Sequence, residues 1–285
     1  MIQIFVDSGA NLSPELREQY NIHLLPMALT IDDQPAPDGL DGHEYYEALR
    51  SGADVRTSMV NPDDARKAFE PYIAQGDDVV YFSISAGISG SWWSAKLAGD
   101  ELMEQYPQRR VCPIDSMGAS LGAGIPALKA SSLVRQGMGL DELVEKMTVY
   151  CQNYCQYFAV DDLKYLRKGG RLPAAVAVAG GMLGIKPLIT IKEGKVAMAG
   201  KARGLPGAYV ALFKKIEELG GVNPRFPSLA GYTISPREVN PIQTYLVDNL
   251  GLPEPLVRQI GCVIGTHAGP GAFGLAFFDN GLVID

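Results

Sequence analysis

The stretch VVYFSISAGISGSWWSAK, Val79–Lys96, decides the fold. Its first six residues are an apolar run typical of a strand buried on both faces, and after several small residues a helix is predicted to begin near Ser91 or Trp92. Apolar runs at 2–6 and 110–114 have the same character, and helical patterns separate the three. Strands that alternate with helices in this way predict a parallel sheet with helices on both faces.

The second half of the chain has a different pattern. The stretch ITIKEGKVAMAG predicts an antiparallel hairpin that turns at Glu193-Gly194. One strong helical pattern at 235–250 interrupts the later predicted strands at 228–234, 256–265 and 272–278. We therefore expect an α/β protein of two domains. Residues 1–158 form an N-terminal α/β domain, and residues 159–285 form a C-terminal mixed α+β domain.

Charge and hydropathy exclude several classes of protein. The chain has 285 residues and a net charge of -7, without a cluster of Lys and Arg along the sequence, which argues against nucleic-acid binding. Its first residues lack the pattern of a signal peptide. The longest uncharged apolar stretch, Leu172–Ile185, has 14 residues, fewer than the ~20 needed to cross a bilayer. We expect a cytoplasmic protein without an integral membrane segment.

Two loops carry hydroxyl groups next to helix starts. The helix predicted after Ser89 begins with unpaired backbone N–H groups, and Ser89 and Ser91 add hydroxyl donors there, a combination that suits an anion. Thr57 and Ser58 precede a second helix start. Loops at the carboxyl ends of parallel strands converge on one crevice, so both loops are expected to face one pocket. An ordinary helix cap and local turns are the alternative interpretations.

Other kinds of chemistry have weaker support. No spacing typical of metal ligands or of a nucleotide motif is present, so no cofactor is expected. The sequence GISGS differs from the G-x-S-x-G motif at its last position, which leaves a serine hydrolase or esterase using Ser89 and His267 as an alternative. A pure interaction module is a third class. The apolar block Gly169–Ile191 is either core or a slot for a long apolar ligand.

The chain also resembles a known family. The motifs that carry the resemblance follow one another in the family's order over nearly the whole chain: TSMVNPDDA, ISAGISGSWWSA, IDSMGASLG, LKYLRKGGRL, GIKPLI, GKARG and THAGPGAFG. They are similar to those of the DegV family, bacterial proteins that bind fatty acids, some of which present the fatty acid to a fatty acid kinase. The resemblance implies two α/β domains with the ligand between them.

The resemblance also implies roles for single residues. Thr57, Ser89 and His267 match the family residues that bind the carboxylate of a long-chain fatty acid. Supporting residues would be Ser58, Gly90, Ser91, Thr266 and Gly269, and the acyl-chain pocket would include Leu183, Ile185, Ile189 and Phe273. Arg203, in GKARG, matches the segment that meets the kinase.

The implied protein is a carrier and not an enzyme. An ATP-dependent fatty acid kinase would be its partner and would form the acyl phosphate, and the fatty acid would be bound as ligand with no cofactor. The chain departs from the family pattern at Met59, Ala86 and Trp92-Trp93, which bears on the chain length and unsaturation of the preferred acid.

Overall fold

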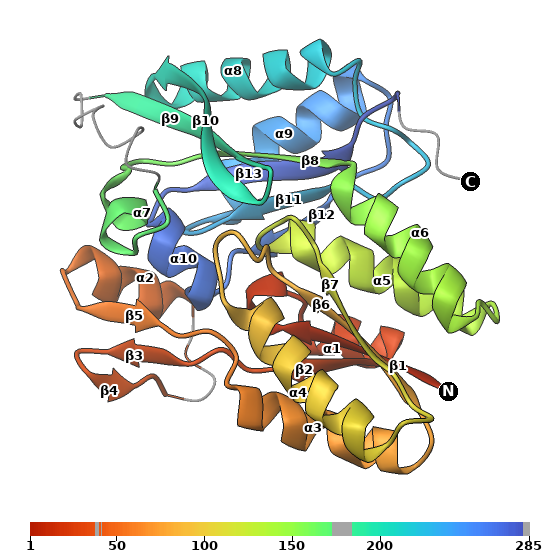
Figure 1. Cartoon of the computed structure of the whole chain (residues 1–285). Helices are drawn as coiled ribbons and strands as arrows, with labels where there is room; N and C mark the ends of the chain where they lie inside the picture. Colours follow the sequence, from red (N-terminus) through yellow and green to blue (C-terminus); the bar gives the residue numbers. More distant parts are fainter. Residues whose placement is uncertain (38–39, 41, 173–183, 282–285) are drawn as a thin grey trace. The chain divides into compact units, whose positions relative to one another are not determined.

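A computed structural model of the chain describes residues 1–37, 40, 42–172 and 184–281 (Figure 1). The chain divides into two compact units, here called unit 1 and unit 2. Unit 1 contains Met1–Ala28 and Ser58–Gln152, and unit 2 contains Leu29–Thr57 and Asn153–Asp285.

Unit 1 is built around a parallel sheet of four strands in the order β2-β1-β6-β7. Helices α3 and α4 pack together against the sheet, and α5 packs with α1 and α6. This arrangement confirms the predicted parallel α/β architecture (Figure 1). The elements are β1 (Ile2–Asp7), η1 (Ser8–Ala10), α1 (Pro14–Tyr20), β2 (Ile22–Leu25), α3 (Pro62–Ala74), β6 (Asp78–Ser83), α4 (Ser91–Gln105), β7 (Val111–Asp115), α5 (Leu121–Arg135) and α6 (Leu140–Gln152).

The sequence explains the helix starts of unit 1. Helix α1 begins with Pro14 after Ser13, whose hydroxyl accepts the Leu16 N–H at 3.3 Å. Helix α3 begins with Pro62 after Asn61, whose side-chain oxygen accepts the N–H of Asp63 at 2.8 Å. Side-chain capping by Ser or Asn followed by Pro at the first helical position is a strong start signal. These local signals account for both helix starts.

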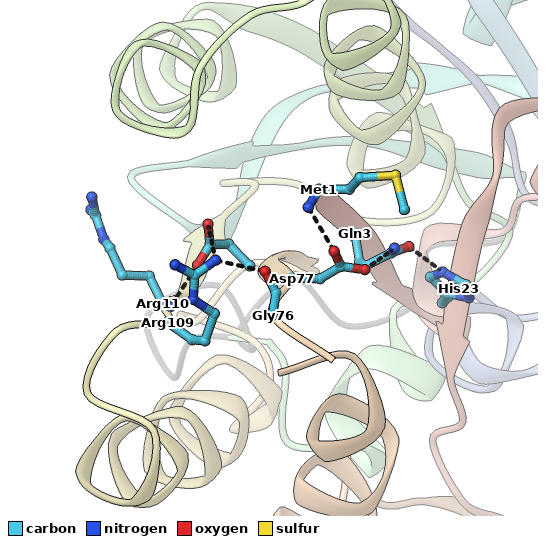
Figure 2. A network of polar contacts seen from close by, with 8 residues as sticks. Met1, Gln3, His23, Gly76, Asp77, Arg109 and Arg110 are labelled. Carbon is cyan, nitrogen blue, oxygen red and sulfur yellow. Dashed lines mark hydrogen bonds and ion pairs between the residues drawn. The ribbon is translucent and has the colours of Figure 1, made fainter. Parts of the chain in front are cut away.

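A polar network ties together the amino ends of β1 and β6 (Figure 2). The Asp77 carboxylate accepts hydrogen bonds from the Met1 ammonium at 2.6 Å and from the Gln3 side chain at 2.8 Å. Gln3 also pairs with a ring nitrogen of His23, 3.0 Å away, and Arg109 donates to the carbonyl of Gly76 at 2.6 Å. Ligands of open parallel sheets bind at the opposite, carboxyl ends of the strands, so we assign this network to stability.

Unit 2 is built around a mixed sheet of six strands in the order β10-β9-β8-β13-β11-β12. Neighbouring strands are antiparallel except β11 and β12, which are parallel. The predicted hairpin turn is confirmed, since Glu193 and Gly194 both have positive φ, 50° and 75°. The main elements are β8 (Tyr154–Ala159), α7 (Lys164–Lys168), β9 (Ile185–Lys192), β10 (Lys195–Arg203), α8 (Gly204–Glu218), β11 (Leu229–Tyr232), η3 (Pro236–Val239), α9 (Asn240–Thr244), η4 (Tyr245–Asn249), β12 (Leu256–Gln259), α10 (Cys262–Ala268) and β13 (Phe273–Phe278).

One face of this sheet forms the core of unit 2. Leu212 and Ile216 of α8 pack with Leu188 of β9 and with Phe273 and Phe277 of β13, all of them buried. Helix α8 lies along β9 and β10 (Figure 1). Each fully buried Leu, Ile or Phe side chain stabilises the fold by roughly 1.5–3 kcal/mol, so this cluster is a major source of the unit's stability.

The segment Leu29–Thr57 belongs to unit 2, although it lies among unit 1 residues in the sequence. It forms a small antiparallel sheet and one helix: β3 (Leu29–Ile31), β4 (Gln34–Pro35), α2 (Gly42–Arg50) and β5 (Val55–Thr57). Tyr45 and Tyr46 of α2 are fully buried, and their hydroxyls bond to Thr266 and to the Ile260 carbonyl, each at 2.6 Å.

The observed division differs from the predicted domains 1–158 and 159–285 in two places. Residues 29–57 join the second unit because their buried tyrosines pack against its residues Ile234 and Cys262. The boundary near 158 lies within β8, which pairs with β9 and β13 and therefore belongs wholly to unit 2. The strands of the inserted segment have only two or three residues, too few for a periodic pattern.

The Tyr46 hydroxyl gives a test of how this segment is anchored. Replacement Tyr46→Phe leaves the buried Ile260 carbonyl without the hydrogen bond from the tyrosine hydroxyl, so we expect a loss of about 1–3 kcal/mol in the free energy of unfolding. Urea unfolding followed by circular dichroism measures it. The matched change Tyr106→Phe removes an exposed hydroxyl and should cost much less. Equal losses in the two variants would show that the Tyr46 bond does not anchor the segment.

Candidate functional site

Thr57 and His267 form the centre of the candidate site. Thr57 is the last residue of β5, and His267 lies in the last turn of α10. The Thr57 Oγ1 and His267 Nε2 atoms are 2.8 Å apart, a normal hydrogen bond. The structure therefore brings two of the three predicted carboxylate ligands together, within unit 2.

His267 lies in a helix, α10, whereas the sequence predicts a strand at 256–265, directly before it. The run Cys262–Ile264 reads as the end of a strand, but it forms the start of α10. Gly269 ends this helix with a φ of 77°, a conformation that glycine adopts readily. A Cβ atom at Gly269 would also collide with the ring of Tyr165. Gly269 thus fixes the path of the chain after His267.

Burial keeps the His267 side chain neutral. Desolvation, assisted by the positive charge of Arg171, lowers the pKa of His267 to about 4. The ring packs against Gly169, where any Cβ atom would collide with it. Its Nδ1 atom is buried and has no hydrogen-bond partner among the described residues. At neutral pH the ring therefore carries one proton, on one of its two nitrogens.

The two neutral tautomers differ in what they offer a ligand. With the proton on Nε2, His267 donates to Thr57 Oγ1, and the Thr57 hydroxyl proton is available to an incoming acceptor. With the proton on Nδ1, a buried N–H group has no acceptor, which is rare in folded proteins. The first tautomer is favoured. His267 then orients Thr57, which presents the donor.

Thr266 has a structural role in this arrangement. Its hydroxyl donates to the carbonyl of Cys262 at 2.8 Å and lies 2.6 Å from the Tyr45 hydroxyl. Since Thr266 has a single hydroxyl proton, Tyr45 is the donor in the second bond. Thr266 therefore supports α10 and its packing with α2.

The predicted serine loop lies in unit 1. Helix α4 begins at Ser91, as predicted, and Gly90 is its N-cap. The buried Ser89 accepts the Ser91 N–H at 3.2 Å, and its Oγ atom lies 3.0 Å from Ser91 Oγ. Ser91 Oγ accepts the Val60 N–H at 3.1 Å. Among the supporting residues, Ser58 is exposed and Gly90 packs against Met59.

The predicted acyl-chain residues lie on two faces of the unit 2 sheet. Ile189 pairs with Phe158, which pairs in turn with Gly274, so these residues share one face, and Ile185 follows the same alternation along β9. Phe273 pairs with Ala159 and belongs to the opposite face, under α8. An acyl chain on one face would contact only one of these two groups. Leu183 lies outside the described residues.

A basic pocket adjoins Thr57 and His267. It has a volume of about 730 Å³ and lies entirely within unit 2, bordered by α2, β5, α7 and α10. Thr57, Thr266 and His267 line it, and so does one carboxylate, Asp54. Six cationic side chains also line it: Arg50, Arg56, Lys164, Arg167, Lys168 and Arg171.

This pocket is not predicted from the sequence, where the Lys and Arg residues do not stand out as one cluster. The fold gathers six of them from residues 50–56 and 164–171. The signal that was present is the run LKYLRKGGR, which carries four of the six, Lys164, Arg167, Lys168 and Arg171. The net charge of -7 gives no sign of this basic run, because the acidic residues are spread over the rest of the chain.

Further observations bear on the remaining predictions. Arg203, the last residue of β10, is exposed. Across the described ranges no group of three or more His, Cys, Asp or Glu side chains could hold a metal ion. Within the same ranges, every helix is too short or too polar to cross a membrane.

The two units define an α/β protein with a basic pocket beside Thr57 and His267, and comparison with known proteins makes its class specific. The family model described as DegV matches residues 1–280, and the chain belongs to the DegV family. DegV domain-containing proteins of Deinococcus radiodurans and Lactococcus lactis are 31% and 30% identical to it, and each alignment covers 96% of this chain and 96–97% of the relative.

Solved structures show the same fold. A DegV family protein from Thermus thermophilus, described as binding fatty acid, superposes with a TM-score of 0.87 at 29% identity, covering 98% of this chain and 99% of that one. DegV of Bacillus subtilis, described as a fatty acid binding protein, gives a TM-score of 0.84 at 27% identity, with coverage of 98% and 99%. The fold class and the family predicted from the sequence are confirmed.

The neutral state of His267 gives a pH-dependence prediction. Its folded pKa of about 4 lies below the usual histidine pKa of 6.5, so the unfolded chain binds more protons between these values. Its contribution to stability is present above pH 6.5 and is lost as the pH falls to about 4, by up to about 3 kcal/mol. A ¹H–¹⁵N NMR titration of the imidazole should give a pKa well below 6.5.

The stability measurement needs a matched variant, because Asp7 changes the free energy of unfolding with pH in the opposite direction to His267. Burial raises the pKa of Asp7 to about 6, so its contribution to stability increases as the pH falls. Comparing the wild type with His267→Gln isolates the histidine, and the exposed His43→Gln is the control. If the acid-induced loss of stability is the same in wild type and His267→Gln, His267 is not buried as a neutral base.

Proposed function

We propose that this chain binds a long-chain fatty acid and holds its carboxylate at Thr57 and His267. The observation that carries the proposal is the 2.8 Å hydrogen bond between these two residues at the edge of a cationic pocket. Further support comes from the solved relatives that are described as fatty acid-binding, including a stearic acid-binding protein from Eubacterium ventriosum with a TM-score of 0.84 at 25% identity.

The two ends of such a ligand interact in different ways. Burial of ~15 chain carbons at ~0.8 kcal/mol each provides about 12 kcal/mol before the cost of association, so the tail supplies most of the affinity. A carboxylate that leaves water needs hydrogen-bond donors, and each charge-assisted bond returns roughly 1.5–3 kcal/mol. In our proposal Thr57 is such a donor, and neutral His267 holds it in position.

Other parts of the proposal rest on the family resemblance. Ser89 would donate a further hydrogen bond to the carboxylate, and Leu183, Ile185 and Ile189 would line the acyl chain. Phe273, which the resemblance also implies, lies on the other face of the sheet and would not contact the same straight chain as Ile189. The protein would act as a carrier without catalysis of its own, in the cytoplasm, with Arg203 contacting an ATP-dependent fatty acid kinase that phosphorylates the carboxylate.

Thr57→Val tests the head-group assignment. The change keeps the shape of the side chain and removes its hydroxyl, so we expect fatty acid to bind about tenfold more weakly or worse. Solvent extraction of the purified protein with mass spectrometry identifies the lipid, and fluorescent fatty acid displacement measures affinity. The control Thr148→Val alters an exposed threonine on α6. If the wild type retains no fatty acid and binds none when it is added, the proposed function is wrong.

The serine hydrolase alternative makes the opposite prediction for Ser89. A nucleophilic serine would be labelled by an active-site phosphonate, and Ser89→Ala would abolish ester turnover. In the carrier proposal Ser89 is a hydrogen-bond donor, so we expect neither labelling nor turnover by the wild type. Intact-protein mass spectrometry after phosphonate treatment decides between the two, and a stoichiometric adduct on Ser89 would favour the hydrolase.

A further inference from the structure

A series of buried polar side chains connects Asp7 to Ser89 within unit 1. Asp7 is the last residue of β1, Tyr81 lies in the adjacent strand β6, and Ser89 and Ser91 lie at the start of α4. Asp7, Tyr81 and Ser91 have no exposed surface, and Ser89 is 7% exposed. Because buried polar groups need hydrogen-bond partners, the direction of each bond in the series is constrained.

Each group in the series contacts the next. The Tyr81 hydroxyl donates to Asp7 Oδ2 at 2.9 Å. Burial and the charge of Asp7 raise the pKa of Tyr81, whereas a hydrogen bond with Ser91 lowers it. A bond that lowers the pKa of a phenol stabilises its ionised oxygen, so Ser91 is the donor in this bond. The Oγ atoms of Ser91 and Ser89 are 3.0 Å apart.

While Asp7 is ionised, all of these bonds point toward its carboxylate. Each hydroxyl has one proton, so Tyr81 donates to Asp7 and Ser91 donates to Tyr81. Ser91 Oγ already accepts the Val60 N–H at 3.1 Å, and its remaining lone pair accepts the Ser89 proton. Ser89 then has no proton left for a ligand. It presents only a lone pair, which repels a carboxylate.

A proton on Asp7 reverses the direction of the series. Asp7 Oδ1 lies beside Gly9 and has no hydrogen-bond partner among the described residues, so a proton is better placed on Oδ2, where the Tyr81 oxygen accepts it. Tyr81 then donates to Ser91, and Ser91 donates to Ser89. Since Ser89 Oγ also accepts the Ser91 N–H, both of its lone pairs are used. Its own proton is free to bind a carboxylate.

The surroundings of Asp7 allow it to titrate near neutral pH. Burial raises its pKa to about 6, although hydrogen bonds lower it in part, and these come from Tyr81 and from the N–H groups of Ile84, Gly9 and Ala10. Strands β2 and β6 and helix α5 pack against β1. Their other titratable side chains are His23, Asp78, Lys129 and Arg135. Burial, and not the charge of these groups, sets the pKa of Asp7.

We propose that Asp7, acting through Tyr81 and Ser91, determines whether Ser89 donates to a fatty acid carboxylate, so that binding of the carboxylate is coupled to uptake of one proton by Asp7. This role rests on the proposed function and makes Asp7 a positioning residue. The proton comes from solvent, the fatty acid stays ionised, and the site gains no net negative charge.

The sign of the pH dependence follows from this coupling. The ligand favours protonated Asp7, so the pKa of Asp7 is higher in the complex than in the free protein. Affinity is therefore greatest below pH 6, where Asp7 is already protonated, and falls as the pH rises above 6. The limit for uptake of one proton is about a tenfold loss for each pH unit. His267, with a pKa of about 4, does not titrate in this range.

Binding of hexadecanoic acid between about pH 5.5 and 8 tests the proposal. Displacement of a fluorescent fatty acid measures affinity, and calorimetry in two buffers of different ionisation enthalpy counts the protons taken up. We expect the wild type to take up close to one proton at pH ~7. Asp7→Asn cannot take up this proton, and Tyr81→Phe interrupts the series while keeping Asp7. Both variants should lose the proton uptake, and their affinities should change with pH only as far as the ionisation of the ligand itself dictates.

A second carboxyl group provides the control. Burial also raises the pKa of Glu238, which lies in η3 of unit 2, outside the series, so Glu238→Gln should keep the proton uptake of the wild type. Binding by the wild type without proton uptake would overturn this proposal and leave the proposed function standing. Wild-type proton uptake by Tyr81→Phe would do the same, and this variant decides the matter if Asp7→Asn does not fold. No binding at any pH would overturn both proposals.

Discussion

The hydrogen bond between Thr57 and His267 joins residues 210 positions apart, and the rest of the site depends on it. Thr57 reaches His267 because the segment Leu29–Thr57 packs on unit 2. The buried hydroxyls of Tyr45 and Tyr46 bond to the region that contains α10. Tyr45 and Tyr46, which bind no ligand in the proposed function, therefore set the position of the donor Thr57. Buried, hydrogen-bonded anchors of this kind hold a functional group in place more firmly than an exposed loop does.

Charge and hydrogen bonding are divided between different residues at this site. Burial and the nearby Arg171 keep His267 neutral, so the ring is a directional partner for Thr57 and not a source of charge. Positive charge comes instead from the arginines and lysines of the basic pocket. A protonated His267 would repel Arg171 and would lack an acceptor for its Nδ1 proton. The cations of the pocket wall are therefore compatible with His267 only while its ring is neutral.

The sequence predicts those elements whose signals are local. The parallel strands of unit 1 are apolar on both faces, and the start of α4 at Ser91 and the turn at Glu193-Gly194 follow from short-range chemistry. The start of α10 was missed because Cys262, Val263 and Ile264 are apolar and partly β-branched, which favours a strand when read alone. Tertiary packing favours the helix instead, because the Tyr46 side chain packs against Gly265, where there is no room for a Cβ atom.

Properties that depend on distant segments could not be predicted from local patterns. The membership of residues 29–57 in unit 2 arises from contacts made by two tyrosines, and their strands are too short to indicate a partner. The cationic wall arises when α7 meets the segment that contains Arg50 and Arg56. The family resemblance identifies Thr57 and His267 without giving the tautomer, which follows only from the unpartnered Nδ1.

The alternation of the unit 2 sheet sets a limit on how a ligand tail is held. Successive residues of a strand point to opposite faces, so Ile189 and Phe273 cannot both contact one straight acyl chain. Phe273 already fills the core under α8, where its ring lies 4.6 Å from that of Tyr209. A tail on the side of Phe273 would have to displace packed side chains, at a cost similar to overpacking a core. On the side of Ile189 the strand β13 carries Gly274, which has no side chain, and the ring of Phe158 packs over it. The Ile189 side of the sheet is therefore favoured for the apolar part of the proposed ligand.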